Sequence, residues 1–278
     1  MSHEISVATF NIHAGVDGWG RPFDVVGAAR RIDADVLILE ENAGADGAPS
    51  IADTVAKTLG YRVVLRPFTG VKLVEPFAPT ADEPSWGPTG LRPQVRAIRY
   101  AQEASLRWRQ MTEAERQRPA RAATLGLAVL ARVDHRHEVA PLPNLLADPT
   151  RRALISLEIP LDSGTVRVAG THLGHLTHGS PRQMNRIRSL LRSGPPTVLG
   201  GDFNCWGPLL LGFLPKMRRA VVGPTWPSWR PRHQIDHLLV SRGLEVVDAA
   251  IFDSLGSDHL AVRGIFRLNR PRSSRRGA

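Results

Sequence analysis

The feature that most constrains the fold is a series of short apolar segments, each with a polar cluster at one end. The segments are as long as buried strands and shorter than ordinary helices. A scaffold of strands can gather polar groups from the strand ends into one pocket. The chain therefore reads as a strand-rich protein with a polar site at one end. The clusters are Thr9–Asn11, Glu40–Asn42, Thr171–Leu173, Gly200–Asn204, Gln234–His237 and Ser257–His259.

The most informative of these clusters is Gly200–Asn204, which follows the apolar run Pro196–Leu199. Asp202 and Asn204 are two residues apart, so on an extended segment their side chains point to the same side. The two glycines let a ligand or another backbone come close. A carboxylate beside an amide suits a hydrated divalent cation and a phosphate oxygen.

Each cluster taken alone has an ordinary explanation, because Asn, Asp and Gly are frequent in turns that end strands. Six such turns carrying carboxylates, amides and imidazoles are harder to explain in that way. The combination favours one functional site.

The pattern predicts many short strands and few helices. This argues against a parallel Rossmann sheet and favours two packed, mostly antiparallel sheets covered by helices, an α/β (α+β) fold. A Pro at position 181 predicts the start of a helix with Ser180 as its cap. Helices are predicted near 22–32, 50–59 and 181–192, and strands near 4–10, 35–40, 61–66, 124–131, 152–160, 164–171, 196–201, 235–241, 245–252 and 259–267.

The order of these polar residues, with the motifs Gly201–Asn204 and Ser257–His259, resembles the endonuclease/exonuclease/phosphatase superfamily over about residues 4–267. The resemblance implies a four-layer α/β/β/α sandwich. Two positions depart from the family pattern: His13 replaces an acidic residue found in many repair endonucleases, and Glu40 replaces the Gln that precedes the metal-binding Glu.

The resemblance also implies a metal, Mg²⁺ or Mn²⁺, and the sequence offers no soft ligand set for another ion. Glu41 is expected to be the main ligand. Asn11 is expected to support it, and Asp258 to contribute.

The resemblance assigns catalytic roles to five further residues. Asp202 would orient or deprotonate the attacking water, and Asn204 would bind a phosphate oxygen or help to place that water. His259 would contact the phosphate while Asp236 holds its tautomer. His172 would bind the phosphate or stabilise the leaving oxygen.

The formal net charge of +10 indicates a polyanionic partner. A genome rich in Arg codons explains why 33 of the 36 basic residues are arginines, but not the excess of positive charge. A basic surface attracts polyanions, and Arg binds phosphate bidentately. We therefore expect nucleic acid first and an anionic lipid surface second.

The chain is expected to form one catalytic domain, 1–268, with an Arg-rich insertion at about 75–122 and a basic disordered tail, 269–278. Arg96 and Arg99 of the insertion are candidate substrate-binding residues. Arg152 at the opening of a strand, and Trp226 in a loop before Asp236, are two more candidates for contact with substrate.

These observations predict a divalent-metal-dependent phosphodiester hydrolase, a nuclease acting on DNA or other nucleic acid. One alternative is the same chemistry on a phospholipid headgroup or soluble phosphoester, and a second is a non-catalytic nucleic-acid-binding protein. No apolar run approaches the ~20 residues of a membrane span, and no signal peptide is recognisable. We expect a cytoplasmic monomer without an obligate protein partner, and its lone cysteine, Cys205, excludes an intrachain disulfide.

Overall fold

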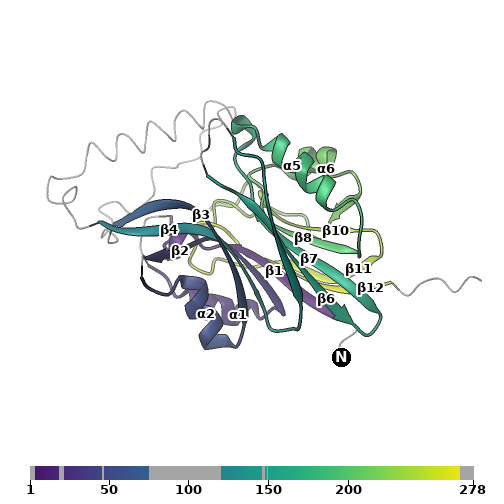
Figure 1. Cartoon of the computed structure of the whole chain (residues 1–278), viewed down its shortest axis with the longest axis horizontal. Coiled ribbons are helices and arrows are strands. Elements are labelled where there is room, and N and C mark those ends of the chain that lie inside the picture. Colours follow the sequence, from purple (N-terminus) through teal and green to yellow (C-terminus); the bar gives the residue numbers. More distant parts are fainter. Residues whose placement is uncertain are drawn as a thin grey trace, which may run out of the picture.

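Two six-stranded sheets pack face to face between helices in the computed structural model (Figure 1). The structure describes residues 4–18, 22–45, 47–74, 120–145, 148 and 150–269. Within these residues, no helix is both long and apolar enough to cross a membrane. The strands are β1 (Glu4–Asn11), β2 (Val36–Ala45), β3 (Arg62–Val74), β4 (Ala120–Ala131), β5 (Arg136–Pro141), β6 (Ala153–Leu161), β7 (Gly164–His172), β8 (Thr197–Asp202), β9 (Met217–Arg219), β10 (Asp236–Ser241), β11 (Leu244–Ile251) and β12 (Val262–Leu268).

The first sheet has the order β11-β12-β1-β2-β4-β3, and the second has the order β5-β6-β7-β8-β10-β9. Each sheet contains one parallel pair among its described strands, β1 with β2 and β7 with β8. The remaining pairs are antiparallel. Two mostly antiparallel sheets were predicted, and that prediction is confirmed.

The main core lies between the sheets. In β1, Ile5 and Val7 face the opposite sheet, whereas Ala8 and Phe10 pack outward. This alternation is what a strand with both faces covered requires. Gly170 of β7 and Gly200 of β8 are register partners, and a Cβ on either would lie within 3 Å of Ile38 in the other sheet. The sheets are therefore closely packed at this level.

Helices cover the outer face of each sheet, which gives the four expected layers. The first sheet packs against α1 (Val25–Ile32) and α2 (Ile51–Leu59). The second packs against α5 (Ser180–Leu190) and α6 (Gly207–Phe213) through residues such as Met184, Ile187 and Leu210. Single turns of 3₁₀ helix, η1 (His13–Gly15) and η2 (Leu176–His178), follow β1 and β7.

The structure departs from the sequence predictions in a few elements. Ser180 is wrong as a helix cap: Gly179 is the N-cap, and Ser180 is a fully buried first residue. Strands β5 and β9 and helix α6 were not predicted. β4 begins at Ala120, so the last residues assigned to the Arg-rich insertion belong to the sheet. Arg96, Arg99 and the tail from residue 270 lie outside the described residues.

His237 gives a stability prediction that is separate from catalysis. Its side chain is fully buried, with Nε2 3.0 Å from the Cys205 carbonyl oxygen and its ring edge-to-face against Phe203. Burial lowers its pKa to about 4. A histidine in the unfolded chain has a pKa near 6.5. Between that pH and about 4, the unfolded chain therefore binds a proton at this residue and the folded chain does not.

Stability should therefore fall as pH falls from about 6.5 to 4, by up to ~3 kcal/mol from this residue. His237→Gln keeps an N–H donor and removes the titration. Urea unfolding of both proteins at pH 7 and pH 4.5 should show a larger loss in the wild type. Equal losses would mean that His237 accepts a proton in the folded state.

Candidate active site

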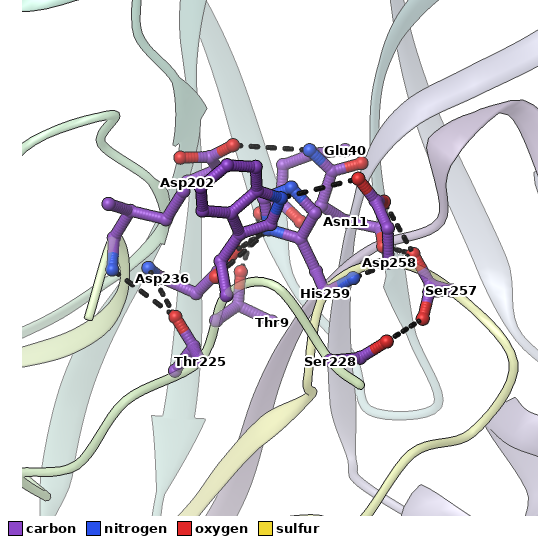
Figure 2. A network of polar contacts seen from close by, with 12 residues as sticks. Thr9, Asn11, Glu40, Asp202, Thr225, Ser228, Asp236, Ser257, Asp258 and His259 are labelled. Carbon is purple, nitrogen blue, oxygen red and sulfur yellow. Dashed lines mark hydrogen bonds and ion pairs between the residues drawn. The ribbon is translucent and has the colours of Figure 1, made fainter. Parts of the chain in front are cut away.

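The site is the polar end of the core between the two sheets. Along each contributing strand, apolar residues face inward until the last inner position, which is polar. Thr9 and Asn11 continue the inner face of β1, and Asp202 continues that of β8. Asp236 opens β10 as the register partner of Asp202. Figure 2 shows these side chains pointing toward one another from both sheets.

A bulge in β2 brings Glu41 to this site. The β2–β4 register shifts between Leu39 and Asn42, and Glu41 has a φ of +54°. Strict alternation would turn Glu41 away from the inner side occupied by Glu40. Instead, the Glu41 Oε1 atom lies 3.3 Å from Nδ2 of Asn11.

Asn11 joins the two sheets at the site. Its Nδ2 donates to Oδ2 of Asp202 at 3.1 Å as well as to Glu41. Its Oδ1 accepts from the backbone N–H of His13 at 3.0 Å. The side chain is fully buried. One amide thus holds a carboxylate from each sheet, and its oxygen keeps a second lone pair free for a cation.

Asp202 sits in an environment that favours its protonated form. Burial, followed by the nearby negative charge of Asp236, raises its pKa to about 7. Its Oδ1 accepts from the backbone N–H of Asn204 at 2.8 Å. The residue preceding Asp202 is Gly201, and a Cβ at this position would lie only 1.9 Å from the Thr171 carbonyl oxygen. That clash explains the need for this glycine.

Asp236 and His259 form a buried pair. Nδ1 of His259 lies 3.0 Å from both carboxylate oxygens of Asp236, and both residues are almost inaccessible to solvent. Burial alone would lower the pKa of His259, but Asp236, Asp258 and Asp202 together hold it well above its usual value. These surroundings favour the protonated imidazole, which could serve as an electrostatic partner for an anion.

His172, at the end of β7, is the opposite case. Burial, with the positive charge of Arg152, keeps its pKa well below the usual value. Its Nε2 lies 3.6 Å from Oδ2 of Asp202 and 3.4 Å from Nδ2 of Asn204. Arg152 donates to the His172 carbonyl oxygen at 3.0 Å and to Asp148 at 3.1 Å. The surroundings thus favour the protonated form of His259 and the neutral form of His172.

Asp258 lies at the edge of the site beside Trp226. Nε1 of Trp226 donates to Oδ2 of Asp258 at 3.3 Å, and the Trp226 ring centroid is 6.4 Å from that of His259. Nδ1 of His13 lies 3.4 Å from Oδ1 of Asp258. Trp226, predicted as a candidate for contact with substrate, contacts two of the candidate site residues.

All predicted catalytic and metal-binding residues, together with Arg152 and Trp226, are linked by these contacts. Three supporting residues were not predicted. Thr9 donates to the buried carboxyl group of Glu40, Thr225 Oγ1 accepts from the backbone N–H of Asp236, and Ser257 donates to the Asn11 carbonyl oxygen. Thr9 and Ser257 had a sequence signal, each as the first residue of a polar cluster, and Thr225 had none.

The structure offers two oxygen-rich places for a metal. The buried group Asp202, Asp236 and His259 has ligand atoms within 4.8 Å of one another. The Asp236 carboxylate of this group also contacts Nδ1 of His259 at 3.0 Å. The other place is the side chain of Glu41, which is less buried, with that of Asn11 at 3.3 Å. Both donor sets suit a hard divalent cation.

The sequence model of the Endonuclease/Exonuclease/phosphatase family matches residues 8–259. No curated protein sequence gives a significant match.

Solved structures share the fold at low sequence identity. An endonuclease/exonuclease/phosphatase from Beutenbergia cavernae DSM 12333 is 20% identical with a TM-score of 0.64, covering 96% of this chain and 72% of that chain. The human Nocturnin catalytic domain with bound sulfate anion is 18% identical with a TM-score of 0.60, at 96% and 94% coverage. ANGEL2, a 2′,3′-cyclic phosphatase in complex with adenosine-2′,3′-vanadate, is 15% identical with a TM-score of 0.56, at 95% and 96% coverage.

Proposed function

Because the chain belongs to the endonuclease/exonuclease/phosphatase family, whose members are generally hydrolases of phosphoesters, we propose that it is a metal-dependent phosphodiesterase acting on nucleic acid. One observation carries the proposal. The charged His259–Asp236 pair and the proton-accepting Asp202 lie together at the buried end of the inter-sheet core.

The two sides of this arrangement suit hydrolysis of an anionic ester. Asp202 has a pKa raised to about 7, which matches a general base that works near neutral pH. His259, held protonated by Asp236, offers positive charge to a phosphate oxygen. Neutral His172 and the amide of Asn204 complete the hydrogen-bonding surface of the pocket. We assign to them contact with the phosphate and the leaving oxygen.

We propose Mg²⁺ or Mn²⁺ as the cofactor, held by Glu41 with Asn11 and Asp258. Carboxylate and amide oxygens are the ligands these ions prefer, and the described residues near the site offer no thiolate to compete, since Cys205 is buried with its pKa raised to about 11. A divalent cation bound there would supply positive charge at the phosphate and lower the pKa of water. Asn11 then fixes the carboxylates of Glu41 and Asp202 relative to each other.

Two observations support nucleic acid as the substrate. The chain has a formal net charge of +10, which raises the local concentration of polyanions. The structurally similar ANGEL2 binds an adenosine-2′,3′-vanadate, and the Nocturnin domain binds sulfate, both of them oxyanions. Arg152 lies beside His172, anchored by Asp148, and we propose that it helps to hold the substrate phosphate.

A substrate panel tests this proposal. Plasmid, single-stranded DNA, abasic duplex, RNA, sphingomyelin and inositol phosphates should be assayed with Mg²⁺ and with Mn²⁺. We expect the highest kcat/KM on a nucleic acid, with the Asp202→Asn protein, purified identically, as the control for contaminating nuclease. A higher kcat/KM on sphingomyelin or an inositol phosphate would indicate that the substrate is a lipid or a soluble phosphoester. Nucleic-acid binding without turnover of any substrate would indicate a non-catalytic binding protein.

A further inference from the structure

The outer face of α5 carries unpaired positive charge. Arg182, Arg186 and Arg188 are exposed on the helix, and Arg192 is exposed just beyond its end. No described carboxylate forms an ion pair with any of these four arginines. Their guanidinium groups are therefore free to bind another anion.

The surrounding sequence adds no negative charge to this face. Asp202, which is buried in the active site, is the only acidic residue between Ser163 and Ile235. The same stretch contains nine arginines and one lysine. The helical layer on the other sheet differs, because its Asp33 pairs with Arg132 and Asp53 lies in the first turn of α2. Four of these nine arginines, Arg182, Arg186, Arg188 and Arg192, lie on α5 or just beyond its end.

The topology starts α5 at the end of the sheet that carries the active site. β7 and β8 are parallel neighbours and end at His172 and Asp202, so the chain segments that follow them, leading into α5 and α6, leave from the same end of the sheet. Figure 1 shows the two helices side by side over the second sheet. At about 1.5 Å per residue, Arg182 and Arg192 are roughly 15 Å apart along the helix direction. That span corresponds to about four phosphates at ~3.4 Å per step along one strand of a duplex.

The residues on the exposed side of α5 favour a nucleic acid over a membrane as its binding partner. Met184 and Ile187 are fully buried against the second sheet, and the exposed positions between the arginines are polar, Asn185 and Ser189. A helix that lies in a membrane interface exposes apolar residues for insertion, and α5 has none on its outer face. Arginines spread over a polar exposed side of the helix suit a phosphate backbone.

We propose that the exposed arginines of α5, Arg182, Arg186, Arg188 and Arg192, form a track that binds the phosphate backbone of a nucleic-acid substrate and leads it from the catalytic pocket. The track rests on the proposed function of the site. Because these contacts are made to phosphates, they fix the position of the strand without selecting its sequence.

The test measures binding apart from turnover, in proteins that all carry Asp202→Asn. The track variant replaces its four arginines with Gln. A matched control variant replaces four exposed basic residues on the side of the first sheet: Arg30, Arg31, Lys57 and Arg62. Fluorescence anisotropy with a labelled 30-nucleotide single strand, over a series of salt concentrations, gives the affinity and its salt dependence.

The track variant should bind at least about 10-fold more weakly at 50 mM salt. Its slope of log K against log salt should be shallower by roughly 3, since each lost contact to a single strand removes about 0.7. The control should keep most of the wild-type slope. Thermal melting checks that both variants are folded. If track and control variants lose affinity equally, only net charge matters and the track is wrong.

A second arm uses vesicles of phosphatidylcholine with phosphatidylserine. Trp206 and Leu209, at the start of α6, are 40% and 45% exposed. They are large apolar side chains of the kind that could insert into a lipid surface. Loss of vesicle binding in the track variant, with unchanged DNA binding, would overturn the proposal in favour of a membrane face. If the wild type binds DNA through the track but hydrolyses no nucleic acid, the track stands and the proposed function fails.

Discussion

Replacing Asp202 by Asn is expected to lower kcat by roughly 10²-fold or more, which corresponds to about 2.7 kcal/mol or more in the barrier. The amide has the same shape and keeps an oxygen for the Asn204 N–H, so the fold should survive. It cannot accept a proton from water. Steady-state kinetics on the best nucleic-acid substrate, with circular dichroism to confirm folding, measure the effect.

Two further variants make this result specific. His259→Ala should cause a comparable loss of kcat, because it removes the positive charge held by Asp236. Asp134→Asn, at a carboxylate that is 89% exposed and pairs with Arg62, is the matched control and should behave as wild type. Near-normal turnover of Asp202→Asn would show that the central motif has another role.

Removing divalent metal with EDTA is expected to abolish hydrolysis, and Mg²⁺ or Mn²⁺ should restore it. Glu41→Gln should raise the metal concentration needed for half-maximal activity, with partial recovery in excess metal, because a charged ligand is lost while Asn11 remains. Activity titrations against Mg²⁺ give both values. Full turnover after metal stripping would contradict the metal requirement.

The same titration distinguishes the two oxygen-rich places in the site. If the metal binds at Asp202, Asp236 and His259 instead, Asp236→Asn should shift the metal titration and Glu41→Gln should leave it unchanged. If Glu41 is the main ligand, Asp236→Asn should lower kcat with little change in the metal titration, since its carboxylate then serves to hold His259.

The strands and the end of the sandwich that carries the site could be predicted because each strand is a short apolar run with polar residues at one end. Such runs are visible in the segments before Asn11 and Asp202. The two-residue spacing of Asp202 and Asn204 was also a useful guide, although Asn204 turns away from ideal strand geometry with a φ of +47°.

The rest depended on contacts between residues far apart in the sequence. The Asn11–Asp202 hydrogen bond joins residues 191 positions apart, and the Ser257–Asn11 bond joins residues 246 apart. The β2 bulge that turns Glu41 inward has no glycine to mark it. Helix α6 is short, and its glycines and proline are typical of a loop, so the sequence did not predict a helix there. Whether residues 1–268 form a single domain stays a prediction.

The absence of side chains at Gly170 and Gly200 limits which substitutions the site can tolerate. Each half of the site belongs to a different sheet, and only close approach lets Asn11 reach Asp202 at 3.1 Å. A methyl group at either glycine would lie within 3 Å of Ile38 in the opposite sheet, so the packing between the two sheets would have to adjust. The alignment of the site residues therefore depends on packing in the apolar core, so a variant that keeps every polar residue can still lose activity.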